Sequence, residues 1–251
     1  MKTDKAKQEE IDFPDKLDSK TSKWLKSKPF GDYDRDESRR IFADFSVILF
    51  ILNKYRPEAK DICELGCGSG WLSIFLSKMG YKVSGYDISP GMIDVAKEKA
   101  KKEGVSVLFG VLDIEDEILK EKINSCDAVI IYDALHHCQS DEKVIKKAFA
   151  YLRTGGVLIL AEPNICHSTD ADAIEAREKY SVSERGLSYV NLAKICRNVG
   201  FVWVKRYHGS GQSFLPRNEG LIDTIKMLIF PLLTRFYYSK RRTRIWLVAK
   251  K

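Results

Sequence analysis

One stretch, Glu64-Leu65-Gly66-Cys67-Gly68-Ser69-Gly70, constrains the fold of this chain more than any other. The apolar-leaning run over residues 61–65 predicts a buried strand, and the pattern from Trp71 to Ser77 predicts a helix. A strand, a glycine turn and a helix in this order let a flat ligand lie against the backbone, because no Cβ atom blocks its approach. The stretch therefore predicts a ligand site at the end of this strand.

The spacing of the glycines argues against a dinucleotide. The nicotinamide fingerprint Gly-x-Gly-x-x-Gly places a diphosphate on a helix N-terminus, but Trp71 stands where its third glycine belongs. We expect Glu64, Asp87 and Asp113 around the same pocket, where they would repel a diphosphate. These carboxylates suit a cationic ligand with ribose hydroxyls and an exocyclic amine. A nicotinamide oxidoreductase is therefore disfavoured.

These features resemble the class I S-adenosylmethionine-dependent methyltransferases of the small-molecule type. Five motifs match in order over about residues 40–207, and they include the turn Leu152-Arg153-Thr154-Gly155-Gly156 before the fifth strand. The resemblance implies S-adenosyl-L-methionine as the cofactor. The cofactor-binding residues that it implies are Glu64, Gly66, Cys67, Gly68, Gly70, Asp87, Ile88, Met92, Asp113, Ile114, Tyr132 and Asp133.

The resemblance also implies a role for each part of the site. The backbone of residues 66–70 would seat the methionine portion, and Glu64 would hold its amino end. Asp87 would take the ribose hydroxyls, and Asp113 the adenine amine. Met92 either packs on the adenine or fills the core.

From residue 62 to 163, short apolar runs alternate with helical patterns, which predicts a parallel sheet covered on both faces. In the family, two later segments, 201–207 and 245–249, close the sheet, and the last runs antiparallel. The expected fold is a Rossmann-like doubly wound α/β sheet of seven strands. We expect the earlier strands near 61–65, 82–87, 105–109, 126–132 and 156–162, and helices near 71–79, 90–103 and 141–151.

The domain organisation follows from composition. Residues 1–20 are rich in charge and poor in apolar side chains, so we expect them to be largely disordered. We assign 1–34 to a flexible N-terminal segment and cap, and 35–251 to the methyltransferase domain. Insertions are expected near 164–187 and 211–242.

The loop after the fourth strand carries the candidate catalytic group. Backbone at Tyr132 and Asp133 should border the sulfonium, and His137 is the expected general base, because imidazole titrates near neutral pH. Alternatively, one of the two adjacent histidines caps the next helix and neither does chemistry. We expect no metal, since the consecutive residues His136, His137 and Cys138 converge poorly on one ion.

Charge and cysteine content bear on the partners and the cellular location of the protein. The formal net charge of +7 comes from 42 basic and 35 acidic residues, a mild excess that predicts no nucleic-acid partner. The six cysteines form no Cys-x-x-Cys pair, which favours reduced thiols in the cytoplasm. The N-terminus shows no apolar signal segment.

An apolar stripe over residues 221–236, followed by basic residues to 244, has two interpretations. It lies on a membrane surface, or it is buried against the domain or a partner in a homodimer. The predicted protein is accordingly cytoplasmic, with a peripheral membrane location left open.

The favoured function is methyl transfer from S-adenosylmethionine to a small-molecule or lipid-linked acceptor, with oxygen as the preferred acceptor atom. The alternative is a membrane-associated or partner-binding protein that retains the cofactor-binding fold without turnover.

Overall fold

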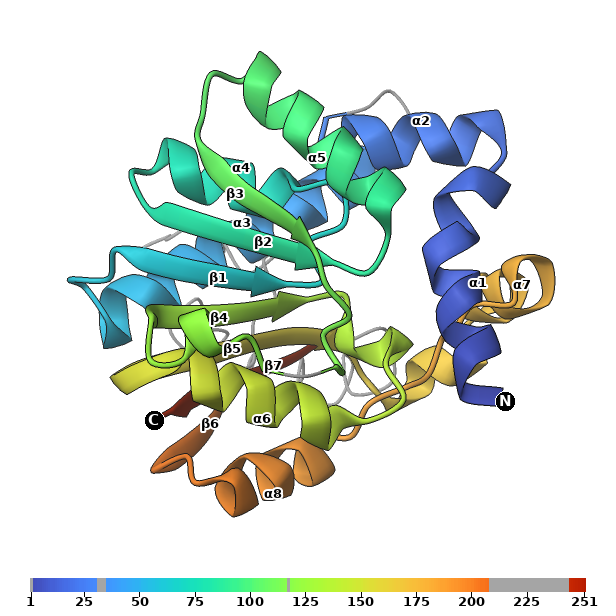
Figure 1. Ribbon diagram of the computed structural model, residues 1–251. Coiled ribbons are helices and arrows are strands. Elements are labelled where there is room, and N and C mark those ends of the chain that lie inside the picture. Colours follow the sequence, from blue (N-terminus) through green and yellow to red (C-terminus); the bar gives the residue numbers. More distant parts are fainter. Residues whose placement is uncertain (1, 31–34, 117, 208–243) are drawn as a thin grey trace, which may run out of the picture.

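The computed structural model describes residues 2–30, 35–116, 118–207 and 244–251. At its centre is a seven-stranded sheet with the order β3-β2-β1-β4-β5-β7-β6. The neighbours from β3 to β5 pair in parallel, whereas β7 pairs antiparallel with both β5 and β6 (Figure 1). This confirms the predicted sheet. Its strands are β1 Asp61–Leu65, β2 Lys82–Asp87, β3 Val107–Val111, β4 Cys126–Tyr132, β5 Leu152–Pro163, β6 Trp203–Tyr207 and β7 Arg244–Lys250.

Helices cover both faces of the sheet. The longer ones are α1 Lys2–Lys16, α2 Ser19–Ser27, α3 Arg35–Tyr55, α4 Trp71–Lys78, α5 Pro90–Lys102, α6 Asp141–Tyr151, α7 Ala171–Tyr180 and α8 Tyr189–Val199. Short 3-10 turns are η1 Lys120–Lys122, η2 Leu135–His137 and η3 Ile165–Thr169.

Strand β4 shows why two helical layers are needed. All of its residues are buried, and successive side chains point to opposite faces. Val129 and Ile131 belong to the core cluster that includes α6 and α8, whereas Ala128 and Ile130 belong to the cluster that includes α3 and α4. A continuous apolar strand is stable only when both of its faces are covered.

The strand order reverses between β1 and β4. In doubly wound sheets, ligands bind in the crevice at the carboxyl ends of the strands beside such a reversal. Helix α1 stands next to this edge, beside α7 (Figure 1). The fold therefore brings the glycine loop, the loop after β4 and the N-terminal helix to one end of the sheet.

The N-terminal segment differs from the prediction. Composition predicted disorder over residues 1–20, but residues 2–16 form α1 and a second helix begins at Ser19. Asp18 caps that second helix by accepting from the backbone N–H groups of Lys20 and Thr21. Helix α1 reaches the domain through polar contacts, such as the ion pair between Lys7 and Asp113. An apolar periodicity could not reveal contacts of this kind.

Four strands begin elsewhere than predicted. Strand β6 begins at Trp203 rather than 201, and β7 begins at Arg244 rather than 245. Strand β3 starts at Val107 rather than near 105, because the Val105 N–H closes the end of α5 by donating to the Ala100 carbonyl at 3.1 Å. Strand β5 starts at Leu152, four residues before the predicted 156. The apolar stripe at 221–236 lies outside the described residues. None of the described helices is long and apolar enough to cross a membrane.

Candidate active site

The glycine loop is held by backbone hydrogen bonds. Both Gly66 and Cys67 donate their N–H groups to the Tyr86 carbonyl, at 2.8 and 2.9 Å. Gly66 has a φ of +78°, and a Cβ there would lie 2.2 Å from the Cβ of Ala134. Gly68 has a φ of +50°, yet a Cβ at this position would meet no atom within 4 Å. The loop is therefore tight against the loop after β4 and open at Gly68.

Asp87, at the end of β2, forms hydrogen bonds with the glycine loop and with the residue before α5. Its Oδ2 accepts from the Gly68 N–H at 2.8 Å, and its Oδ1 accepts from the Ser89 N–H at 3.0 Å. Burial raises the pKa of Asp87, although both hydrogen bonds favour the carboxylate. The carboxyl group thus lies between the glycine loop and the start of α5, and its contact with a ribose stays a prediction.

Glu64, near the end of β1, is a buried acid that forms no ion pair among the described residues. It is 2% exposed, and within the described part of the chain Ser73 is its hydrogen-bond partner. Burial raises the pKa of Glu64 to about 8, despite the hydrogen bonds from Ser73. A cation placed beside this group would stabilise the carboxylate.

Asp113 follows β3 and already has a cation. Its carboxylate forms an ion pair with Lys7 of α1, and Oδ1 accepts from the Glu115 N–H at 2.8 Å. A further contact joins α1 to this edge, because the Ser89 hydroxyl donates to the Ile11 carbonyl at 3.2 Å. The three predicted acids therefore lie at one edge, but one of them is neutralised by the N-terminal helix.

Several other predicted cofactor residues have side chains packed in the protein interior. Cys67, Met92 and Ile114 are buried, and Ile88 is partly buried. The Tyr132 hydroxyl donates to Asp44 at 2.7 Å. These side chains belong to the packed interior around the edge.

Asp133 has a φ of +50° and is held by two arginines. It forms an ion pair with Arg244 of β7, and it lies 3.5 Å from an Nη2 atom of Arg40. Burial opposes its ionisation, but the two guanidinium groups hold the pKa of Asp133 well below its usual range. This charge is therefore satisfied within the protein.

Two histidines lie on η2, beside the glycine loop. His136 is buried, and its Nδ1 lies 2.8 Å from Oε2 of Glu162 at the end of β5. Glu162 is fully buried and also accepts from the N–H groups of Ala134 and Leu135. Burial favours the neutral ring, but hydrogen bonds with Glu162 and Glu184 raise the pKa of His136 to about 9.

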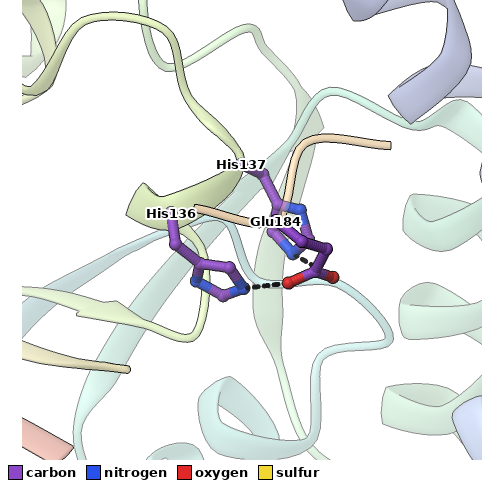
Figure 2. A group of neighbouring side chains, drawn as sticks. All are labelled: His136, His137 and Glu184. Carbon is purple, nitrogen blue, oxygen red and sulfur yellow. Dashed lines mark ion pairs between the residues drawn. The ribbon is translucent and has the colours of Figure 1, made fainter. Parts of the chain in front are cut away.

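His137, the predicted base, is partly exposed. Its Nδ1 donates to the Ser183 carbonyl at 2.7 Å. The rings of His136 and His137 lie with centroids 4.1 Å apart, although adjacent side chains were expected to diverge. Figure 2 shows both rings beside the carboxylate of Glu184, which enters from the connection after α7. Carboxylates nearby, including Glu10 and Glu184, raise the pKa of His137 against burial and the neighbouring His136.

Sequence reasoning did not include Glu184, Glu162 or Glu10 in the site. Each is distant in sequence from His137, and no short spacing connects them. The position of Glu162 at the carboxyl end of a predicted strand was the one available signal, since such ends meet at the ligand edge. His167 of η3 is also close, with its Nε2 2.7 Å from Oε2 of Glu184.

Comparison with known proteins agrees with this geometry. Residues 62–156 match the family profile of a methyltransferase domain. This match supports the class I S-adenosylmethionine-dependent methyltransferase family for that part of the chain. This confirms the resemblance, and with it the cofactor expected for the family.

Curated relatives match about half of the chain. It is 33% identical over 115 residues to the ubiquinone biosynthesis O-methyltransferase of Coxiella burnetii, which covers 46% of this chain and 48% of the relative. It is 28% identical over 129 residues to the protein of the same name from Xanthomonas axonopodis pv. citri, covering 51% and 54%. The chain therefore spans about half the length of the curated relatives it matches.

Solved methyltransferase structures resemble the fold over more than 80% of the chain. An S-adenosylmethionine-dependent methyltransferase from Mesorhizobium loti aligns with a TM-score of 0.60 at 16% identity, covering 83% of this chain and 98% of that one. Phosphoethanolamine N-methyltransferase 2 of Haemonchus contortus, crystallised with S-adenosyl-L-methionine, aligns at 0.58 with 18% identity, covering 87% and 57%. At such identities the likeness concerns the fold.

Proposed function

We propose that this protein transfers the methyl group of S-adenosyl-L-methionine to an oxygen atom of a small-molecule acceptor. The observation that carries the proposal is Glu64. A buried carboxyl group with Ser73 as its partner in the described structure lies at the glycine loop, where a cation can bind it. Buried charges in proteins are normally paired, so this group suits a ligand that brings its own ammonium.

The other proposed contacts of the cofactor lie at the same carboxyl-end edge of the sheet. The open side of Gly68 leaves room for the methionine portion against the backbone. Asp87 offers carboxylate oxygens to the ribose hydroxyls, and Asp113 offers them to the adenine amine. Binding at Asp113 competes with Lys7, because the lysine already neutralises that carboxylate.

The cofactor supplies an activated methyl group on a sulfonium. The protein has to place the acceptor in line with that group and exclude water. A hydroxyl acceptor must also lose its proton, and we propose His137 as the side chain that promotes this loss. The loop after β4 carries His137 directly past the glycine loop, since Ala134 touches Gly66. The names of the curated relatives, O-methyltransferases, support oxygen as the acceptor atom.

A more specific proposal is that the acceptor carries a lipid tail. The names of the relatives refer to ubiquinone biosynthesis, and the chain's apolar stripe at 221–236 would suit an acceptor with a long apolar tail. The same stripe suits peripheral membrane contact or a homodimer. The alternative, a binding protein without turnover, keeps the cofactor contacts and predicts no product.

The test uses labelled S-adenosylmethionine and the full-length protein. We expect methyl transfer to one or more members of a panel of hydroxylated aromatic compounds, with and without isoprenoid tails. His137→Ala should lower kcat by about 100-fold while the affinity for S-adenosylhomocysteine stays unchanged. Tight S-adenosylhomocysteine binding without labelled product from the panel or from lipid extracts would favour the binding-protein alternative. Binding of NAD in preference to S-adenosylhomocysteine would contradict the proposal.

A further inference from the structure

We infer that His136, His137 and Glu184 form a binding site for a divalent transition-metal ion. One ligand atom from each residue lies within 4.8 Å of the other two. Two imidazoles and one carboxylate are ligands that zinc and iron accept in proteins, and three protein ligands leave positions open for a substrate. The third ligand comes from the connection after α7, so the site exists only in the folded chain (Figure 2).

The hydrogen bonds of the two histidine rings leave their Nε2 atoms available to a metal ion beside Glu184. A carbonyl oxygen can only accept, so the contact of 2.7 Å with Ser183 places the proton of His137 on Nδ1. His136 likewise uses Nδ1 toward the carboxylate of Glu162. The neutral rings therefore carry their lone pairs on Nε2, the atoms that lie toward Glu184. A carboxylate or carbonyl on the far ring nitrogen is the usual support of a metal-binding histidine.

The distances are close to those of an occupied site. Nε2 of His136 lies 3.4 Å from Oε2 of Glu184, and Nε2 of His137 lies 4.0 Å from Oε1. Tetrahedral ligands at zinc bond lengths are separated by about 3.3 Å. His167 Nε2 lies 2.7 Å from Oε2, and it donates because an ionised carboxylate only accepts. This is a hydrogen-bond distance, so His167 positions the carboxylate instead of completing the set.

The local charge favours a cation. The ion pairs of Glu184 within the described residues are all with histidines. Glu162 faces His136, and Glu10 of α1 lies 3.5 Å from Nδ1 of His137. When both rings are neutral, as metal ligands must be, three carboxylates surround them, and a divalent ion would replace the ring protons in balancing this negative charge.

A second grouping, Asp133 with His136 and Glu162, fits less well. Asp133 is already paired with Arg244, and its carboxylate also lies near Arg40. Glu162 already accepts two backbone N–H groups besides its contact with His136. Both carboxylates are therefore already engaged in strong contacts, which makes this grouping the weaker of the two candidates.

The site has a consequence that rests on the proposed function. It lies on the loop after β4, where the acceptor is expected. A metal ion there would bind the acceptor oxygen and lower the pKa of its hydroxyl. His137 would then promote proton loss by holding the ion, and the proton would pass to solvent or a nearby carboxylate.

The test measures metal binding without any methyl donor, so it stands apart from the proposed function. Full-length protein, freed of metal by chelation, is titrated with Zn²⁺ and with Co²⁺ in competition with a chromophoric chelator. We expect one ion per chain and visible Co²⁺ bands typical of nitrogen and oxygen ligands. Glu184→Gln and His137→Gln should each weaken Zn²⁺ binding at least tenfold.

Two controls separate this site from adventitious binding. Cys166 is an exposed thiol near His167, and Glu178 is an exposed acid on α7. Cys166→Ser and Glu178→Gln should leave Zn²⁺ affinity unchanged. Circular dichroism confirms that each variant folds. Wild-type protein that binds neither ion, or site variants that bind as tightly as wild type, would overturn the inference.

Discussion

Lys7 of the N-terminal helix forms an ion pair with Asp113 at the end of the sheet, although the two residues lie over a hundred positions apart. The lysine is partly exposed, and the carboxylate is nearly buried. This contact places a cation on the acid that we propose for the adenine amine. The N-terminal helix therefore belongs to the ligand edge, and its charge is expected to affect ligand affinity.

Replacing Lys7 tests that relationship. In Lys7→Ala, Asp113 is free to accept from the adenine amine, so we expect S-adenosylhomocysteine to bind severalfold more tightly, about 1 kcal/mol. Calorimetry measures the change. Lys5→Ala removes an equal charge from an exposed position of the same helix and should have little effect. Equal affinities in wild type and Lys7→Ala would show that the ion pair does not compete with the ligand.

We predict that Glu64 releases a proton when S-adenosylhomocysteine binds. Its pKa of about 8 keeps it mostly protonated at pH 7, and a bound ammonium lowers that pKa, so the proton leaves. Calorimetric enthalpies at pH 7 in buffers of different ionisation enthalpy should reveal close to one proton released per ligand. Glu64→Gln cannot release this proton and should give a value near zero. A wild-type enthalpy independent of the buffer would argue against the ammonium contact.

Gly66 and Gly68 form a matched pair. A Cβ at Gly66 would clash with Ala134, so Gly66→Ala should unfold the protein or lower its stability by about 3 kcal/mol or more. A Cβ at Gly68 meets open space and leaves only the backbone penalty of about 1 kcal/mol. Gly68→Ala should therefore fold but bind S-adenosylhomocysteine more weakly. Thermal melts and calorimetry measure the two effects, and equal losses of stability would contradict the assignment.

Asp127 predicts how stability depends on pH. Burial opposes its charge, but it accepts from the N–H groups of Lys60 and Asp61 and from Arg56 and Arg153 at 2.9–3.0 Å, which lowers its pKa. Its stabilising contribution is therefore present above the unfolded pKa of about 3.9 and is lost as the pH falls toward the lower folded pKa. Asp127→Asn should cost about 2 kcal/mol near pH 7 and less at acidic pH.

Urea unfolding of Asp127→Asn at several pH values measures this effect. Asp61→Asn, at a more exposed site paired with Arg153, is the control and should cost under about 1 kcal/mol. A cost for Asp127→Asn that does not shrink below pH 4 would show that its charge is not the stabilising feature.

Much of the fold could be predicted because its signals are local. The apolar run of β4 and the glycines before Trp71 each identify their own element within a few residues. Asp87 could be placed at the ligand edge because it ends a strand. The convergence of Glu184 on His136 could not be predicted, since it depends on the path of a connection nearly fifty residues later. Helix α1 was missed because polar contacts hold it.

The central claim is that the carboxylates at this edge bind a positively charged nucleoside, with Asp87 holding its ribose. Calorimetry of S-adenosylmethionine binding to wild type and to Asp87→Ala tests it most directly. We predict that wild type binds and that Asp87→Ala binds at least tenfold more weakly, a loss of about 1.4 kcal/mol or more. Unchanged affinity in a folded Asp87→Ala variant would contradict the account.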